Sequence, residues 1–160
     1  MQRATPLMLD LSAMHLLHRA SQFADDAFAQ TVGLRHGLTP RQLAVLAVVN
    51  DEEGLIQTEI VRKSGIDRST LADVIRRLLR KGLIERRRLL TDARAFSVHM
   101  SQPGRDVLAA AAPIANKVDE TILSHLSEDA RAKFLDALAV LADRVEVHLE
   151  ARYSGDAVRA

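Results

Sequence analysis

The sequence contains no cysteine and no tryptophan, and aromatic residues make up only 3% of it. Without cysteine, the chain cannot form disulfide bonds, use a thiolate in catalysis or sense oxidants through a thiol, and we expect a protein of the reducing cytoplasm. A core with so few aromatic residues must consist of Leu, Val, Ile and Ala, which suits packed helices.

Long apolar runs are also missing. Residues 43–49 form one of the longest uncharged apolar runs, and this is far shorter than the roughly 20 residues needed to cross a bilayer. The segment 1–10 contains one Arg and no long apolar stretch, so we expect no secretory signal there. The sequence therefore does not predict a membrane-spanning or secreted protein.

The basic residues that are present concentrate in the middle of the chain. The 160 residues, 48% hydrophobic and 27% charged, have the composition of one globular domain of about 100–200 residues. The formal net charge is only +1, but residues 55–100 contain 11 Lys or Arg against 5 Asp or Glu, while the rest of the chain contains 11 against 16. A basic segment between acidic flanks indicates contact with a polyanion.

Apolar residues at three- and four-residue spacing predict helices along most of the chain. The first is expected over 9–32, with Gly33 and Gly37 as breaks after it. The second covers 40–50, because Thr39 followed by Pro is a typical helix start. A short helix over 58–63 precedes a longer one over 67–81.

The remaining segments predict a hairpin followed by two long helices. Strand-like stretches at 83–90 and 95–100 flank a tight turn. Ser101 and Ser127 are suited to cap the two helices, and Pro113 is expected to kink the first of them. The last helix carries a long apolar face: Phe134, Leu138, Leu141, Val145 and Leu149. The fold class expected is mainly α with a small β-hairpin wing.

The two helices at 58–63 and 67–81, joined by a Gly-containing turn, form a helix-turn-helix arrangement. One side of the longer helix is an apolar stripe that would face the core. An α-helix fits the DNA major groove, and an Arg there can donate two hydrogen bonds to one guanine. The groove-facing residues expected are Arg68, Ser69, Ala72, Asp73 and Arg76, with Arg77 and Arg80 placed to hold phosphates.

The predicted hairpin extends this basic surface. Arg86 and Arg88 lie on its first strand, and Arg94 on its tip is suited to enter a minor groove. Asp92 is placed to orient the Arg94 guanidinium. A basic face is often only a solvated surface, but a basic hairpin directly after a helix-turn-helix favours DNA binding.

Outside this region, His15, His18 and Arg19 share the first predicted helix. They would line a pocket for an anionic effector or a metal, or only pack at a helix interface; packing is the commoner role of such histidines. Zinc needs at least three ligands, and the six histidines show no metal-binding spacing. No phosphate loop, nucleophile elbow or catalytic triad is readable, so we expect neither a metal site nor an enzyme.

Four short motifs in this order resemble the MarR family of winged helix-turn-helix transcription regulators. They are LTPRQLAVL at 38–46, GIDRSTL at 65–71, KGLIER at 81–86 and DARA at 92–95. The resemblance covers nearly the whole chain. It implies one domain over 1–160, with dimerisation helices at 9–37 and 101–153 and a winged helix-turn-helix lobe at 39–100. By motif position, it makes Arg68, Ser69 and Thr70 the DNA-binding residues that open the recognition helix, and Asp92 and Arg94 the wing pair.

The resemblance implies a ligand-responsive repressor rather than a cofactor enzyme. A homodimer would bind a palindromic double-stranded operator and release it when a small effector binds between the dimerisation helices and the lobe. Residues 69–73 and 92–95 are similar to a subgroup linked to aromatic-acid catabolism, so the effector expected is an aromatic carboxylate or its CoA thioester. Asp73 departs from the family pattern, in which Arg or Asn is common, and this indicates a different operator sequence. The alternatives are a metal-responsive regulator of the same fold and a protein-interaction module.

Overall fold

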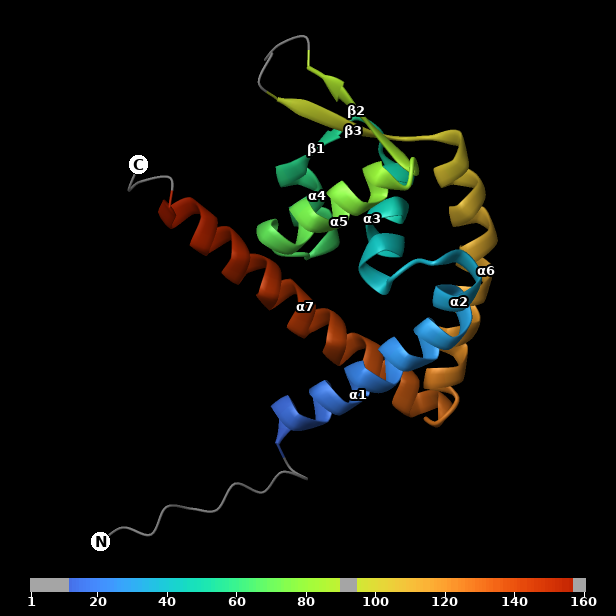
Figure 1. Ribbon diagram of the computed structural model, residues 1–160. Helices are drawn as coiled ribbons and strands as arrows, with labels where there is room; N and C mark the ends of the chain where they lie inside the picture. Colours follow the sequence, from blue (N-terminus) through green and yellow to red (C-terminus); the bar gives the residue numbers. More distant parts are fainter. Residues whose placement is uncertain (1–11, 90–94, 157–160) are drawn as a thin grey trace, which may run out of the picture.

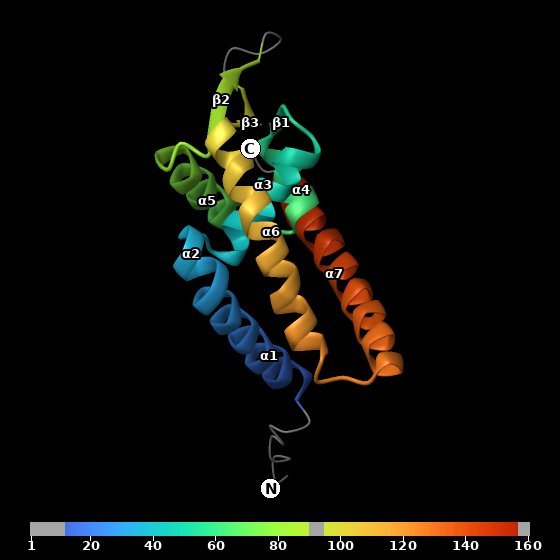
Figure 2. The ribbon, with the colours of Figure 1, turned by 90° about the vertical axis from the view of Figure 1, so that its right-hand side faces the viewer.

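The protein is described by a computed structural model that covers residues 12–89 and 95–156, with side chains up to residue 143. Two parts are visible in Figures 1 and 2: a lobe of short helices and a small sheet, and a frame of three long helices beside it. The frame consists of α1, α6 and α7. The lobe carries the basic middle segment predicted from the sequence.

The first helix extends beyond its predicted end. Helix α1 spans Ala13–Phe28, a π-helical turn follows over Ala29–Gly33, and α2 continues over Leu34–His36. The expectation that Gly33 interrupts the helix is therefore wrong: its φ of −58° and ψ of −51° are helical. The chain turns at Gly37, the second of the two expected breaks, whose φ of 62° lies in the left-handed region that glycine favours.

The lobe begins with α3, which spans Pro40–Asp51. The Thr39 hydroxyl accepts a hydrogen bond from the Gln42 backbone N–H, and the Gln42 side chain accepts one from the Thr39 backbone N–H. Both hydrogen bonds of a capping box are therefore formed. Helices α4, Gln57–Ser64, and α5, Arg68–Arg80, follow. The predicted helix-turn-helix is confirmed, with Gly65 at the turn in the left-handed conformation.

The wing is part of a three-stranded antiparallel sheet rather than an isolated hairpin. Strands β2, Ile84–Arg88, and β3, Phe96–Met100, form the predicted hairpin. A third strand, β1, covers only Leu55–Ile56 and pairs with β3, so the order is β1-β3-β2. Two residues are too few to show a strand pattern in sequence, and this strand was not expected.

Two long helices complete the frame. Helix α6 spans Gln102–Leu123 and continues through Pro113. Ser101 caps it, as predicted, by accepting a hydrogen bond from the Gly104 backbone. Helix α7 spans Glu128–Asp156 and runs back toward the lobe (Figures 1 and 2). The Ser127 side chain accepts from the Ala130 backbone and caps its start.

The core lies inside the lobe, where α3, α4, α5 and the sheet meet. Its fully buried side chains are aliphatic, as the scarcity of aromatic residues requires: Leu46, Ile60, Leu71, Ile75, Leu78, Val45 and Val49, joined by Val32 from the π-helical turn. By contrast, large apolar side chains on the frame are exposed: Met14, Leu16, Leu17 and Phe23 on α1, and Phe134, Leu135, Val140 and Leu141 on α7. The folded chain therefore leaves apolar faces of α1 and α7 uncovered.

Candidate nucleic-acid interface

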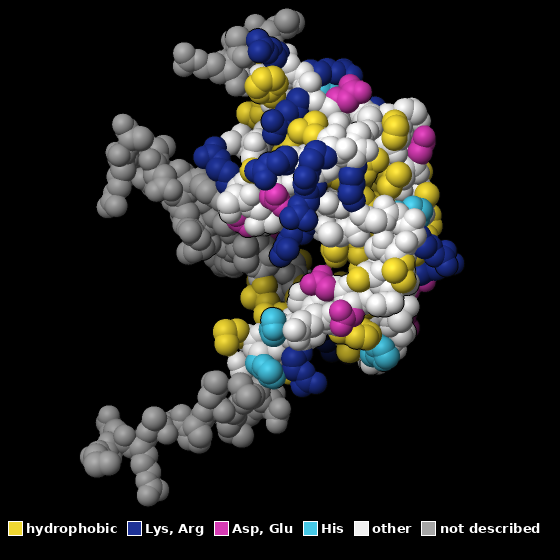
Figure 3. Space-filling view, viewed as in Figure 1, with side chains coloured by type: hydrophobic (Ala, Val, Ile, Leu, Met, Phe, Trp, Pro, Cys, Tyr) yellow, Lys and Arg dark blue, Asp and Glu magenta, His cyan; other side chains and the backbone are white. Residues whose placement is uncertain are grey.

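Helix α5 buries one side and exposes the other. Leu71, Val74, Ile75 and Leu78 are buried in the core. Arg68, Ser69, Arg76, Arg77 and Arg80 are exposed, and Ala72 and Asp73 are half-buried between the two sides. Figure 3 shows Lys and Arg side chains gathered over α5, between the wing and α1. The structure thus brings the residues predicted for the major groove onto one open, basic surface.

The start of α5 is held by its own cap. Asp67 accepts hydrogen bonds from the Ser69 hydroxyl at 2.6 Å and from the Thr70 backbone N–H at 3.0 Å. These bonds, that of Ser69 foremost, hold the pKa of Asp67 well below its usual range. The Ser69 hydroxyl can donate only one hydrogen bond, and it donates that bond to Asp67. Ser69 is therefore prepared to accept, rather than donate, a hydrogen bond at a base edge.

Asp73 lies within this basic surface and pairs with two arginines. Its carboxylate is 3.1 Å from Arg76 Nη1 and 2.7 Å from Arg77 Nε. Such exposed pairs add little stability, up to about 1 kcal/mol. Their effect is directional: Asp73 holds both guanidiniums along the helix. The Arg76 side chain remains 66% exposed, so its other donors can reach a base.

The wing strand β2 presents two different faces. Side chains alternate along a strand, and Arg86 pairs in register with Val98 while Arg87 pairs with Ser97. Arg86 therefore lies on the side of α5, and Arg88, whose guanidinium is 5.9 Å from the centre of the Phe96 ring, lies on the same side. Arg87 lies on the opposite face, 3.5 Å from Glu85. Asp92 and Arg94 lie outside the described residues.

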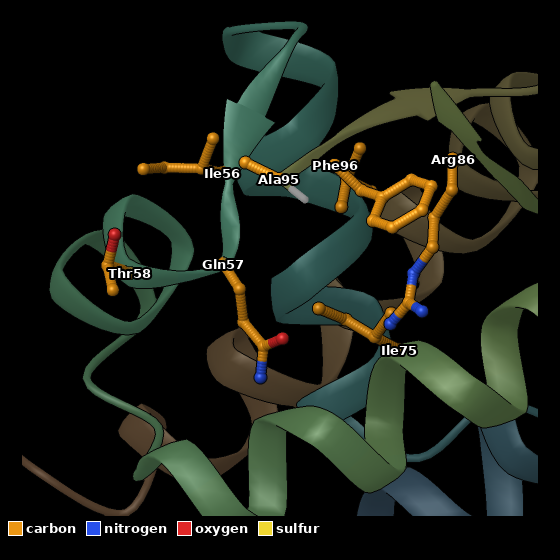
Figure 4. A pocket seen from close by; sticks show the side chains of 8 residues that line it. Ile56, Gln57, Thr58, Ile75, Arg86, Ala95 and Phe96 are labelled. Carbon is orange, nitrogen blue, oxygen red and sulfur yellow. The ribbon is translucent and has the colours of Figure 1, made fainter. Parts of the chain in front are cut away.

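A hollow of about 270 Å³ separates the wing from α5 and the start of α4. Figure 4 shows the Arg86 side chain extending from the strand toward Ile75 of α5, with Gln57 entering from the start of α4. Gln57 and Thr58 were not among the predicted site residues. Their polar side chains give no periodic signal in sequence, and only the pairing of β1 with β3 brings them beside Arg86.

A second, more apolar pocket of about 410 Å³ lies between α1, α3 and α6. This is the junction at which an effector was expected. Its wall consists mainly of aliphatic and Phe side chains, including Phe28, Leu43 and Ile122, and its polar lining residues are Asp25, Asn116 and Asp119.

The predicted effector residues do not line this pocket within one chain. His15 is half-buried near the start of α1, and His18 and Arg19 are exposed. The lining residues of α1 begin only at Ala24. The charged groups that one chain provides at the pocket are therefore carboxylates, not the expected cations.

No metal centre is formed by the part of the chain that the structure describes: nowhere in it do three His, Asp or Glu side chains come together as ligands. The same described residues contain no helix long and apolar enough to span a membrane.

Two polar clusters in the structure were not predicted from the sequence. The Lys81 ammonium, at the end of α5, donates to the Gly37 carbonyl and to Gln42 at 3.3 Å. Glu53, in the turn after α3, accepts a hydrogen bond from Arg105 and lies 3.6 Å from His99. Both clusters join residues more than 35 positions apart, so no spacing in the sequence could indicate them.

Comparison with known proteins shows where this chain has relatives. The MarR family model matches residues 38–96. The putative transcriptional regulatory protein for the hcr operon of Thauera aromatica is 31% identical over 122 residues, which are 76% of this chain and 74% of that protein.

Solved structures extend the likeness to the whole fold. The PcaV transcriptional regulator of Streptomyces coelicolor, in complex with its natural ligand, has a TM-score of 0.81 and 28% identity, over 88% of this chain and 98% of PcaV. The DNA binding of BpsR from Bordetella bronchiseptica is regulated by 6-hydroxynicotinic acid. BpsR has a TM-score of 0.80 and 25% identity, over 87% of this chain and 99% of BpsR. The repressor CouR, bound to a 23-mer DNA duplex, has a TM-score of 0.76 and 27% identity, over 88% of this chain and 99% of CouR.

Proposed function

This chain belongs to the MarR family of transcription regulators, and on that premise we propose that it is a repressor that binds a palindromic DNA operator as a homodimer. The observation that carries this proposal is the exposed basic side of α5, capped by Asp67 and continued by Arg86 and Arg88 of the wing. CouR, of similar fold, is a repressor bound to duplex DNA. In this proposal α5 enters the major groove, and Asp92 and Arg94 serve as the wing pair in the minor groove.

The residues of α5 divide by role along the helix. Arg68, Ser69, Thr70, Ala72, Asp73 and Arg76 face base edges, and Arg77 and Arg80 hold phosphates. The N-terminal end of α5 is the reading end, because the first residues of a recognition helix contact base edges in the major groove. Two copies place two such helices one helical turn of DNA apart, which requires a palindromic site.

Binding to duplex DNA selected from a random pool tests this function. We expect the wild type to enrich a palindromic site and to lose affinity steeply as salt rises, because phosphate contacts release counterions. Fluorescence anisotropy at several salt concentrations measures the slope. Failure to enrich any duplex, together with release from heparin that does not depend on salt, would contradict the proposal.

A pair of variants separates base reading from phosphate binding. Arg76→Ala should relax the preference at one base pair of the selected site, at a cost of roughly 1–3 kcal/mol for the preferred base. Arg80→Ala should weaken all sequences about equally. A panel of single-base variants of the selected duplex measures both. Parallel, uniform losses for the two variants would show that the division of roles is wrong.

We further propose that the effector is an aromatic carboxylate or its CoA thioester. The apolar pocket between α1, α3 and α6 suits an aromatic ring, and BpsR is regulated by an aromatic acid. The carboxylate then needs His15, His18 or Arg19, because Asp25 and Asp119 would repel it within one chain. This assignment therefore depends on how the two copies assemble.

Calorimetry with aromatic acids, their CoA thioesters and the matching neutral amides tests the effector class. We expect an acid or thioester to bind, its amide to bind at least about tenfold more weakly, and the selected duplex to reduce its affinity. Only a ligand that binds the DNA-free protein more tightly than the DNA-bound protein can release DNA. Equal affinity with and without duplex would show that a binder is not the effector, and an amide as tight as its acid would refute the anion assignment.

A further inference from the structure

Lys81, at the C-terminal end of α5, reaches out of the lobe to the turn that follows α2. Its ammonium donates one hydrogen bond to the Gly37 carbonyl and a second, of 3.3 Å, to the Gln42 side chain. Gly37 ends α2, and carbonyl groups at the C-terminal end of a helix have no partner within the helix. A lysine is suited to bind them, because this end carries partial negative charge. Lys81 thus joins α5 to the end of the first frame helix.

The donor and the acceptor of each bond are fixed by chemistry. An ammonium group can only donate, and a backbone carbonyl can only accept. The Gln42 oxygen that faces Lys81 also accepts at 3.2 Å from the Thr39 backbone N–H, which can only donate. Gln42 is 3% exposed, so this oxygen is held in place by the capping box of α3. Lys81 therefore binds two acceptors of the segment 37–42, in which α2 passes into α3.

Packing leaves one side of α5 without support from the frame. Helix α5 packs against α3, α4 and β2, which all belong to the lobe, and α3 joins the lobe to α6. On the other side, a cleft of about 760 Å³ lies between α1 and α5, and Figure 3 shows a hollow between the basic side chains over α5 and acidic side chains on α1. The cleft is lined from α1 by Ser21, Asp25, Asp26 and Ala29, and from α5 by Ser69, Thr70, Asp73, Val74 and Arg77.

This cleft gives Lys81 a mechanical role. A rotation of the lobe about the contact between α3 and α6 would open or close the cleft, because no side chains fill it. Thr39 and Gln42 line the cleft where α3 begins. Lys81 lies one helical turn beyond Arg77, and its bonds to Gly37 and Gln42 resist such a rotation.

We propose that Lys81 is a positioning residue for α5, which holds this helix at a fixed orientation to the frame. Without its two bonds, the two α5 helices of a dimer occupy a wider range of separations, and only part of that range fits two half-sites. The apparent affinity for DNA then falls with the fraction of molecules that are competent to bind. This inference rests on the proposed DNA-binding function and names a residue that prepares the protein for it.

The opposing role for Lys81 is a phosphate contact, since the side chain is exposed and follows Arg77 and Arg80. Salt dependence separates the two roles. A phosphate contact releases counterions and adds about 0.9 to the slope of log affinity against log salt. A bond within the protein is present before and after DNA binds, so its loss lowers the affinity and leaves this slope unchanged.

Binding of the selected duplex by the full-length wild type, Lys81→Met and Arg80→Met at several salt concentrations tests the proposal. Lys81→Met should bind about three- to tenfold more weakly than the wild type, with the wild-type slope. Arg80→Met removes the same charge from the neighbouring residue and is the matched control, and its slope should fall by about 1. Wild-type affinity in Lys81→Met, or a slope reduced as in Arg80→Met, would overturn the proposal.

The separation of the two lobes gives a readout that a loss of stability in folded protein does not change. Because the chain has no cysteine, Arg62→Cys on the exposed side of α4 places one spin label on each copy. Double electron–electron resonance without DNA should give a broader distance distribution when Lys81→Met is added, and an unchanged one when Arg80→Met is added. A distribution as narrow in Lys81→Met as in the wild type would contradict the positioning role.

Hydrogen exchange tests the joint itself without DNA and without a dimer. The protection of residues 37–43 should decrease in Lys81→Met and stay unchanged in Arg80→Met. Lys81→Gln, whose side chain is one bond shorter and uncharged, is a second variant and should behave as Lys81→Met does. Unchanged protection in both Lys81 variants would overturn the proposal. A wild type that binds no duplex refutes the proposed function, while this measurement still decides whether Lys81 holds the joint.

Discussion

Replacing Gly104 with alanine should destabilise the fold by about 3 kcal/mol, the upper end of the cost of overpacking. A Cβ atom at this position would lie 2.0 Å from the Leu83 carbonyl oxygen and 2.9 Å from its carbon. These are backbone atoms, which cannot move aside as a flexible side chain can. Leu83 also accepts a hydrogen bond from the Ser101 backbone, so any shift would pull α6 away from the start of β2. Urea denaturation followed by circular dichroism measures the loss.

Gly33→Ala is the matched control. Gly33 is also helical, with φ of −58°, but its nearest neighbours would lie at an ordinary 3.6 Å from a new Cβ. Alanine there should be neutral or stabilise the protein by up to about 1 kcal/mol, because glycine is the poorer helix former. If Gly104→Ala unfolds at the same urea concentration as Gly33→Ala, the close packing of α6 on the sheet is not as described.

Leu141→Glu should abolish the soluble folded protein, because we propose that the dimer is obligate. The Leu141 side chain is 51% exposed in one chain, and Phe134 on the same helix is 37% exposed. Together with the exposed apolar side chains of α1 they leave two helix faces uncovered, and soluble monomers rarely expose large apolar patches. A glutamate in such an interface would bury an unpaired charge, at a cost of several kcal/mol. We expect aggregated or unfolded protein, measured by soluble yield and sedimentation.

Asp136→Lys is the control for a change of charge on α7. Asp136 lies about half a turn around the helix from Leu141 and Phe134, and we expect this variant to remain a folded dimer. The wild type provides the decisive measurement. Sedimentation of the wild type as a folded monomer at low micromolar concentration would disprove the obligate dimer, whatever Leu141→Glu does.

The helix-turn-helix was predictable because its signals are local. The Asp67 cap lies within three residues of the N–H that it binds, and the apolar stripe of α5 repeats every three or four residues. Hairpin strands adjacent in sequence pair with each other, so β2 and β3 were also predictable. The short motifs indicate the MarR family through residue type and order alone.

Features formed by distant residues were not predictable. Strand β1 exists because Leu55 and Ile56 meet β3, more than 40 positions further along the chain. Gly33 was expected to break a helix because its intrinsic preference is weak, but packing of the π-helical turn against α6 outweighs that preference. Intrinsic helix preferences amount to about 1 kcal/mol even for glycine, less than tertiary contacts supply.

The sequence by itself determined the class of this protein: a helical, cysteine-free chain with a basic helix-turn-helix and hairpin, and a family identity carried by short motifs. These properties depend on residue type and on spacings of a few residues, which a linear pattern records. Only the tertiary structure decided which charges face which site. It paired Asp73 with Arg76 and Arg77, placed Asp25 and Asp119 at the apolar pocket, and enclosed His99 between Glu53 and Ser97. Electrostatic interactions depend on distance and burial in space, and in the pocket and the His99 cluster those are set by residues far apart in the chain.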